Sequence, residues 1–327
     1  MPIGPTPRQE AEPLRLTGPP LDLAQTRRKH PRMPNIKAND ITIEYEVFGD
    51  PSKPALLLVC GLGGQLIDWD ERFCQQLVDR GFFVIRYDNR DTGLSQKFDA
   101  AGAPDMGAVF AAAASGEPIT TPYSLNDMAD DGIALLGALG IDKAHLVGAS
   151  MGGMIVQAMA IRHPAVVRSL CSIMSTTGDP SVGQPTPEAM SALLQPMPTT
   201  REEAVEALVV GFKVVASPGY PTDEPLVRQR AQRTYERCFY PVGAARQLAA
   251  VIAGGDRTAA LGAVTVPTVV IHGDADPLVT PSGGEATAKA IPGSELVMVP
   301  GLGHDFPEAV WPAVLGAVVS NAGRAPG

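Results

Sequence analysis

Hydrophobic residues occur in short runs along most of the chain, and these runs follow two patterns. In residues 41–47, apolar side chains alternate with Thr42, Glu44 and Glu46, which is the period of a strand with one exposed face. Later runs are almost continuously apolar, at residues 55–59, 82–85, 144–147, 268–271 and 296–299. Continuous runs are typical of strands buried on both faces. The pattern therefore predicts an antiparallel edge strand followed by the strands of a buried sheet.

Helical patterns separate these strands. One predicted helix begins at Ser124, with Asp127 as its partner in a predicted capping box, and runs through Leu139 to end at Gly140. Strands that alternate with helices indicate a mostly parallel sheet covered by helices on both faces. The predicted fold class is therefore α/β.

Residues 176–262 depart from this alternation, because they contain no convincing strand. Thr200 and Glu203 predict a capping box before an apolar helix that extends to Val215. Further helices are predicted around residues 223–238 and 242–252. We interpret this segment as a helical cap inserted between two strands of a core formed by residues 35–175 and 263–327.

Residues 1–34 form a separate segment with eight prolines and no periodic apolar pattern. Its end carries a basic cluster, namely Arg27, Arg28, Lys29, His30 and Arg32. The composition predicts a flexible N-terminal extension. An arm that packs on a partner subunit or on the body of the protein is the alternative, and the sequence does not separate the two.

Composition and charge narrow the class of protein. The chain has 327 residues, of which 45% are hydrophobic and 19% charged, which is enough apolar material for a large core and excludes disorder of the whole chain. The net charge of −9 argues against a nucleic-acid partner, because an acidic surface repels phosphate. We expect no integral membrane segment, and the N-terminus lacks the apolar region of a secretory signal. The oligomeric state is not evident from the sequence.

The four cysteines are widely spaced, at Cys60, Cys74, Cys171 and Cys238, and they have no metal-ligand spacing. We interpret them as free thiols in a reducing compartment, with a cytoplasmic location as the expectation.

The strongest chemical signal is the Gly-Ala-Ser-Met-Gly stretch at residues 148–152. It follows an apolar strand and opens an apolar helix, so Ser150 lies at a sharp strand-to-helix turn. Such a turn exposes the serine oxygen at the carboxyl edge of the sheet, where open α/β folds bind ligands. Ser150 is therefore the candidate nucleophile, and a serine that only caps the helix is the alternative.

A serine nucleophile needs a base, and the chain has only five histidines. His304 lies in a glycine-rich loop after the last predicted strand and can reach back over the sheet edge, so we assign it as the general base. His145 and His272 lie within or at the end of strands. A carboxylate should orient His304, and the residues alone leave Asp274 and Asp276 as equal candidates.

The developing oxyanion needs backbone donors. One is expected from Met151, the residue after the nucleophile. The other is expected from the glycine-rich stretch after residues 55–59, where Leu62 N–H is the first choice and Gly61, which also lies close to the substrate, the second. We interpret Cys60 as a buried side chain and not as a nucleophile.

These motifs resemble the α/β-hydrolase superfamily in its serine esterase branch, over residues from about 35 to 320. The stretches that carry the resemblance are residues 86–95, 148–153, 272–278 and 301–304. Within this superfamily, the motifs resemble those of the aclacinomycin methylesterases and related bacterial esterases and lipases. It implies an eight-stranded sheet with an inserted cap. It also implies that residues 86–95 form a structural loop and that the acid is Asp276, which precedes a proline.

The resemblance and the motifs together predict a serine carboxylic ester hydrolase that acts through an acyl-enzyme on a small-molecule ester. Its catalytic residues would be Ser150, Asp276 and His304, with Leu62 and Met151 as oxyanion donors and with no metal or cofactor. A methylesterase acting on a polyketide-like substrate, a carbon–carbon bond hydrolase and a perhydrolase use the same triad. Outside the enzymes, a binding protein for apolar ligands is the alternative.

The cap contains apolar residues that could line a substrate pocket, namely Met190, Leu193, Leu194, Leu208, Val209 and Val210. They favour short or medium apolar esters. The alternative is that these side chains only pack the cap helices together.

Overall fold

A computed structural model describes residues 34–195, 198 and 200–326 of the chain. Within them the strands form one eight-stranded sheet in the order β1-β2-β4-β3-β5-β6-β7-β8. The strands are β1 (Asn35–Ala38), β2 (Ile41–Phe48), β3 (Ala55–Val59), β4 (Phe83–Tyr87), β5 (Ala144–Ala149), β6 (Val167–Ile173), β7 (Thr268–Gly273) and β8 (Glu295–Val299). The β1–β2 and β2–β4 pairs are antiparallel and all the others are parallel, as predicted.

Helices occupy most of the connections between these strands. The α-helices are α1 (Glu71–Val78), α2 (Met106–Ser115), α3 (Leu125–Ala138), α4 (Met151–Arg162), α5 (Pro187–Leu193), α6 (Arg201–Val215), α7 (Glu224–Arg237), α8 (Pro241–Ala253), α9 (Thr258–Leu261), α10 (Pro281–Ala290) and α11 (Trp311–Gly323). Short 3-10 helices are η2 (Leu66–Asp68), η3 (Asp99–Ala101) and η4 (Glu308–Val310). Both predicted capping boxes are present, at the starts of α3 and α6.

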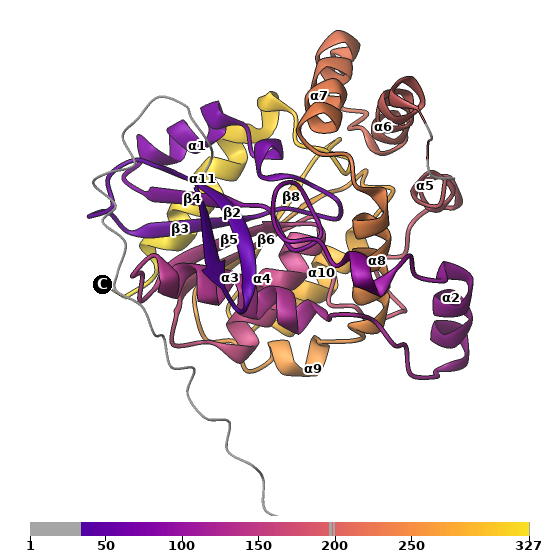
Figure 1. Ribbon diagram of the computed structural model, residues 1–327. Helices are drawn as coiled ribbons and strands as arrows, with labels where there is room; N and C mark the ends of the chain where they lie inside the picture. Colours follow the sequence, from indigo (N-terminus) through magenta and orange to yellow (C-terminus); the bar gives the residue numbers. More distant parts are fainter. Residues whose placement is uncertain (1–33, 196–197, 199, 327) are drawn as a thin grey trace, which may run out of the picture.

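The sheet, which has helices on both sides (Figure 1), separates two hydrophobic cores. Leu57 and Leu146 point to the face covered by α3 and α4, whereas Leu56 and Val147 point to the face covered by α1 and α11. Adjacent residues of one strand point to opposite faces, so a strand with both faces covered must be apolar throughout. This explains the continuous apolar runs in β3 and β5.

The prediction that residues 41–47 form the edge strand is wrong. β2 lies between β1 and β4, and the two edge strands are β1 and β8. The expectation that residues 296–299 are buried on both faces is also wrong, because β8 pairs on one side only and Leu296 is 38% exposed. Glu44, expected on an exposed face, is only 4% exposed. Its surroundings are acidic as well as buried: burial and the neighbouring Asp88 raise the pKa of Glu44 to about 7.

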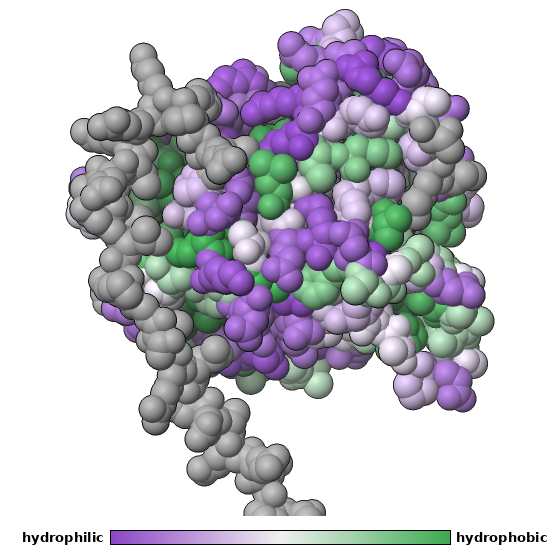
Figure 2. Space-filling view, in the orientation of Figure 1, coloured by the Kyte–Doolittle hydropathy of each residue, from purple (hydrophilic) through white to green (hydrophobic). Residues whose placement is uncertain are grey.

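A helical insertion, residues 174–267, separates β6 from β7 and contains α5 to α9. Helices α6 and α7 pack together through Val205, Val209, Val227 and Ala231. Figure 1 shows α5, α6 and α7 together on one side of the molecule, at the upper right of the view. The surface over α7, at the top of Figure 2, is hydrophilic, because this helix carries arginines on its exposed side.

Of the predicted N-terminal extension, residues 1–34, only Pro34 is among the described residues, so the extension and its basic cluster lie outside them. In the part of the chain that is described, no helix is both long enough and apolar enough to cross a membrane.

Candidate active site

Ser150 lies at the turn between β5 and α4 and has a backbone conformation that non-glycine residues rarely adopt, with φ 57° and ψ −122°. The turn is tight enough to require glycine on both sides. A Cβ on Gly148 would lie 2.1 Å from the Gly152 carbonyl oxygen, and a Cβ on Gly152 would lie 2.2 Å from the Val59 carbonyl oxygen. The glycines of the motif therefore have a steric cause, and strain of this kind is concentrated at functional sites.

The structure brings Ser150, His304 and Asp276 into one chain of contacts. His304 Nε2 lies 2.9 Å from Ser150 Oγ, and His304 Nδ1 lies 2.7 Å from Asp276 Oδ2. All three residues lie in turns or loops that follow parallel strands, at the carboxyl edge of the sheet. With Nδ1 protonated towards the carboxylate, Nε2 is free to accept the serine proton.

Asp276 is held in place by its second oxygen. Asp276 Oδ1 accepts hydrogen bonds from the N–H groups of Leu278 and Val279, both at 2.9 Å. This leaves Oδ2 facing the imidazole of His304. Asp276 is 2% exposed, so its interaction with His304 is little screened by water.

Asp274, the other candidate carboxylate, makes a different contact. Its Oδ1 accepts the N–H of Gly301 at 2.6 Å, which ties the turn after β7 to the loop that carries His304. His272 lies within 3.6 Å of Asp276, but its Nε2 contacts the Val279 carbonyl at 2.7 Å. Burial lowers the pKa of His272 and so favours its neutral ring, which stabilises the turn after β7 through this contact with Val279.

The predicted oxyanion donors lie beside Ser150. A Cβ on Gly61 would lie 3.1 Å from Ser150 Cβ, so the loop after β3 approaches the nucleophile closely. Within the described part of the chain, neither Leu62 N–H nor Met151 N–H donates a hydrogen bond to the protein. Met151 is the first residue of α4, where backbone N–H groups have no partner in the helix and favour negative charge.

The remaining candidates lie apart from this arrangement. Cys60 is buried and its thiol donates to the Gln65 carbonyl, and burial raises the pKa of Cys60 well above its usual value. The unreactive thiol fits a packing role. His145 contacts Ser169 Oγ at 2.8 Å, and burial, with Arg168 nearby, lowers the pKa of His145 to about 4.

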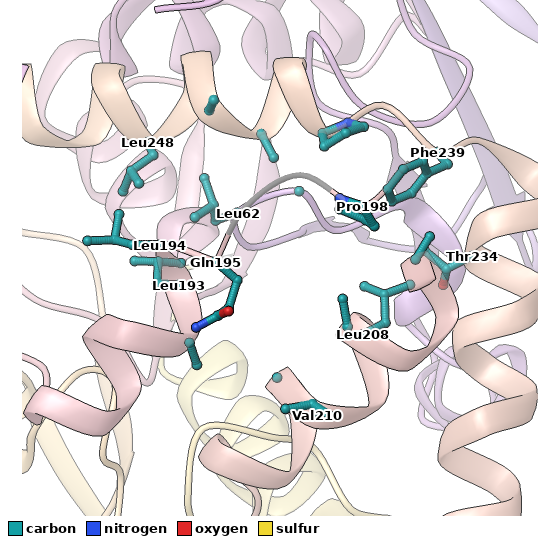
Figure 3. Close-up of a pocket in the computed structure, with 18 of the residues that line it drawn as sticks. Leu62, Leu193, Leu194, Gln195, Pro198, Leu208, Val210, Thr234, Phe239 and Leu248 are labelled. Atoms are coloured by element: carbon teal, nitrogen blue, oxygen red, sulfur yellow. The ribbon is translucent and has the colours of Figure 1, made fainter. Parts of the chain in front are cut away.

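A large, partly open cavity adjoins the loop after β3 and is lined mainly by the helical insertion. Its volume is about 1300 Å³. Leu62 lies on its wall, with Leu193, Leu194, Leu208 and Val210 among the other lining residues (Figure 3). Ser150 is not part of the lining. Leu62, which is, follows Gly61, the residue that packs on Ser150.

The apolar residues named in the insertion do not all lie in the same environment. Leu193, Leu194, Leu208 and Val210 line the cavity, whereas Val209 is fully buried between α6 and α7. No group of three or more His, Cys, Asp or Glu side chains that could hold a metal ion exists among the described residues.

Two polar residues of the insertion support the site, and no sequence motif indicated either of them. Ser217 Oγ accepts the N–H of Gly303, next to His304. Gln247 Oε1 accepts the N–H of Gly63, next to Leu62. Both bonds join residues more than 80 positions apart, so no local motif could have signalled them.

The chain belongs to the α/β-hydrolase-fold family, whose model matches residues 54–308. This confirms the predicted fold class and the resemblance. Rhodomycin D methylesterase DauP from Streptomyces sp. (strain C5) is 28% identical over 312 residues, covering 88% of this chain and 96% of that protein. The 3-oxoadipate enol-lactonase 2 of Acinetobacter baylyi is 27% identical, covering 80% of this chain and 86% of that protein.

Among solved structures, the enol-lactonase from Burkholderia xenovorans LB400 superimposes with a TM-score of 0.67 at 24% identity, covering 89% of this chain and all of that one. This likeness shows the shared fold. Together with the family and the curated relatives, it places the chain among the hydrolases.

Proposed function

We propose that the chain is a serine carboxylic ester hydrolase that works through an acyl-enzyme. The observation that carries the proposal is the Ser150–His304–Asp276 chain of contacts, with atom separations of 2.9 and 2.7 Å. Leu62 and Met151 have backbone N–H groups without protein partners among the described residues. Met151 follows Ser150, and Leu62 follows Gly61, which approaches Ser150 closely. This combination supplies a nucleophile, a base and donors for an oxyanion.

In the proposed reaction, Ser150 Oγ attacks the ester carbonyl carbon while His304 Nε2 takes the hydroxyl proton. The carbonyl oxygen becomes an oxyanion and accepts hydrogen bonds from Leu62 and Met151. His304 then gives its proton to the leaving alcohol, and the acyl group stays on Ser150. A water molecule, deprotonated by His304, releases the acid by the same steps. Asp276 orients the imidazole and stabilises its charged form.

We propose that the helical insertion acts as a cap over this site, within the predicted limits 176–262, on a core of residues 35–175 and 263–327. The apolar residues on the cavity wall support short to medium apolar esters as substrates. Buried free thiols at Cys60, Cys74 and Cys171 fit a cytoplasmic location.

A second candidate, hydrolysis of the methyl ester of a bulky acid, is favoured by the size of the cavity. Its volume of about 1300 Å³ exceeds the roughly 300–1,000 Å³ of ordinary small-molecule sites. The 28% identical relative is named a methylesterase for rhodomycin D. With such a substrate, the bulky acid part fills the cavity and methanol leaves.

The experiment measures hydrolysis of p-nitrophenyl esters from acetate to palmitate by the wild type and by Ser150→Ala. Serine-dependent turnover that is best with short or medium chains supports the first candidate. Preference for the methyl ester of a polycyclic aromatic acid over methyl butyrate supports the second. Binding of apolar ligands without any turnover would contradict both and favour a binding protein. If the protein hydrolyses only carbon–carbon bonds, or only forms peracids from hydrogen peroxide, it is a carbon–carbon bond hydrolase or a perhydrolase instead.

A further inference from the structure

The glycine-rich loop that follows β3 is held by a side chain from the helical insertion. Gln247 of α8 is fully buried, and its Oε1 accepts the N–H of Gly63 at 2.8 Å. Its Nε2 donates to the Arg90 carbonyl at 2.8 Å and contacts Thr92 Oγ1 at 2.6 Å. Rotating the amide by half a turn would set Nε2 against an N–H and Oε1 against a carbonyl, so its orientation is fixed.

This bond fixes the residue that follows Leu62. Gly63 has a left-handed conformation, with φ +65°, and a Cβ there would lie 3.3 Å from Ala244 Cβ of the same helix α8. The turn is closed by Gly64 N–H, which donates to the Gly61 carbonyl at 3.2 Å. The peptide on the carboxyl side of Leu62 is therefore fixed by α8, while Gly61 on its other side packs on Ser150.

The end of the same loop is held by α7. Gln65 Nε2 donates to the carbonyls of Thr234 and Cys238 at 2.9 and 2.7 Å, and Gln65 Oε1 accepts from Arg237 at 2.7 Å. Two helices of the insertion thus set the loop position. Of the two glutamines, Gln247 acts on the residue next to Leu62, because it accepts the N–H of Gly63.

We propose that Gln247 is a positioning residue that sets the Leu62 N–H at the distance an oxyanion requires. The proposal rests on the proposed ester hydrolysis, because only that role makes Leu62 N–H a donor. Oxyanion donors act within a narrow range of distance, and misplacement by about 1 Å can cost about 100-fold in rate. The insertion then has a part in the reaction step as well as in enclosing substrate.

The test compares Gln247→Leu and Gln247→Glu with the wild type on the best p-nitrophenyl ester. For Gln247→Leu, kcat is expected to fall about 10- to 100-fold, with KM changed by less than about threefold, because a bond to the oxyanion is made mainly in the transition state. Gln247→Glu keeps the acceptor for Gly63, and its protonated carboxyl can also donate to Arg90. The ratio of its kcat to the wild-type kcat should therefore rise as the pH falls.

The matched control is Asn321→Leu, which also removes a buried amide. Asn321 on α11 donates to the Leu170 and Pro267 carbonyls, away from the carboxyl edge of the sheet. It should lose stability while its kcat stays near that of the wild type. Wild-type kcat in Gln247→Leu, or an equal fall in Asn321→Leu, would overturn the positioning role alone. Absence of Ser150-dependent turnover in the wild type would overturn the proposed function and this role with it.

Discussion

The backbone N–H of His304 donates to the carbonyl of Val215, with an N–O distance of 2.7 Å. Val215 ends helix α6 of the insertion, so the loop that carries His304 is attached to an element 89 positions earlier in the chain. The attachment extends to Ser217, which is 3% exposed. Ser217 Oγ accepts from Gly303 N–H at 2.8 Å and donates to Asp305.

Ser217→Ala is expected to lower kcat about tenfold, because the His304 loop loses two of its attachments and the imidazole loses its fixed position. It should also lower the free energy of unfolding by about 1–3 kcal/mol, since Gly303 N–H and Asp305 lose a buried partner. Steady-state kinetics and urea unfolding measure the two effects. Ser181→Ala is the control, because Ser181 also bonds an aspartate, Asp179, in the insertion but is exposed. Equal kcat values for the two variants would contradict the expectation.

Asp276→Asn and Asp274→Asn should separate the two carboxylates. Asp276→Asn presents an amide to His304 Nδ1 and favours the wrong tautomer, so kcat should fall by about 10³- to 10⁴-fold. Asp274→Asn keeps an oxygen for Gly301 N–H, so kcat should fall less than about tenfold. The two effects are measured as kcat of the purified variants, and thermal unfolding checks that each variant is folded. A larger loss in Asp274→Asn would assign the acid to the other carboxylate.

Gly148→Ala should fail to fold or lose at least about 4 kcal/mol of stability, because the new Cβ would meet the Gly152 carbonyl at 2.1 Å. Gly316→Ala is the contrast. Gly316 lies on the exposed side of α11, where an added methyl group would meet no atom of the described residues within 4 Å beyond its own helical turns. Alanine should therefore stabilise the helix by up to about 1 kcal/mol. Thermal unfolding of both variants measures the difference, and a stable Gly148→Ala with wild-type kcat would contradict the strained turn.

Arg246→Met tests how the insertion is joined to the core. Burial would raise the pKa of Asp91, but hydrogen bonds led by that from Arg246 hold it below its usual value. Both side chains are almost fully buried, so removing the arginine leaves the Asp91 carboxylate without its cationic partner and should cost about 3–5 kcal/mol. Arg201→Met removes an exposed pair with Glu236 and should cost at most about 1 kcal/mol. Equal unfolding midpoints in urea would contradict this.

The pH dependence of stability should reflect His145. Burial, and secondarily Arg168, lowers the pKa of His145 to about 4 from the ordinary value of 6.5, which the unfolded chain retains. The unfolded state therefore binds the proton first, and stability falls as the pH is lowered from about 7 towards 4. His145→Asn, which lacks this titration, should lose less stability over that range, by on the order of 2 kcal/mol. Parallel curves of unfolding free energy against pH would contradict the assignment.

The continuous apolar runs predicted β3, β4, β5 and β7 because burial on both faces leaves no room for polar residues. The run at residues 296–299 also predicted a strand, β8, although this strand lies at the edge of the sheet and is partly exposed. β6 was not predicted, since Arg168, Ser169 and Ser172 interrupt its apolar pattern. In the structure the hydroxyl groups of both serines have hydrogen-bond partners that are distant in sequence. Ser169 contacts His145, and Ser172 accepts from Gln157. β1 is only four residues long and has little pattern of its own.

At the site, the sequence predicted the residues whose chemistry has a local signature. The turn around Ser150 needs glycine for steric reasons that are visible in the motif, and His304 was found among only five histidines. The supports from Ser217 and Gln247 could not be predicted. Each is a common polar residue whose role exists only when the insertion lies against the core.

Intact-mass spectrometry can detect the acyl-enzyme on which the proposed mechanism depends. The wild type is mixed with excess p-nitrophenyl butyrate, the reaction is quenched in acid during turnover, and the mass of the intact protein is measured. Peptide digestion and mass spectrometry then locate the adduct. We expect a mass increase of one butyryl group on Ser150, a burst of p-nitrophenol, and neither in Ser150→Ala. Turnover without an adduct, or an adduct that persists in Ser150→Ala, would contradict the acyl-enzyme mechanism.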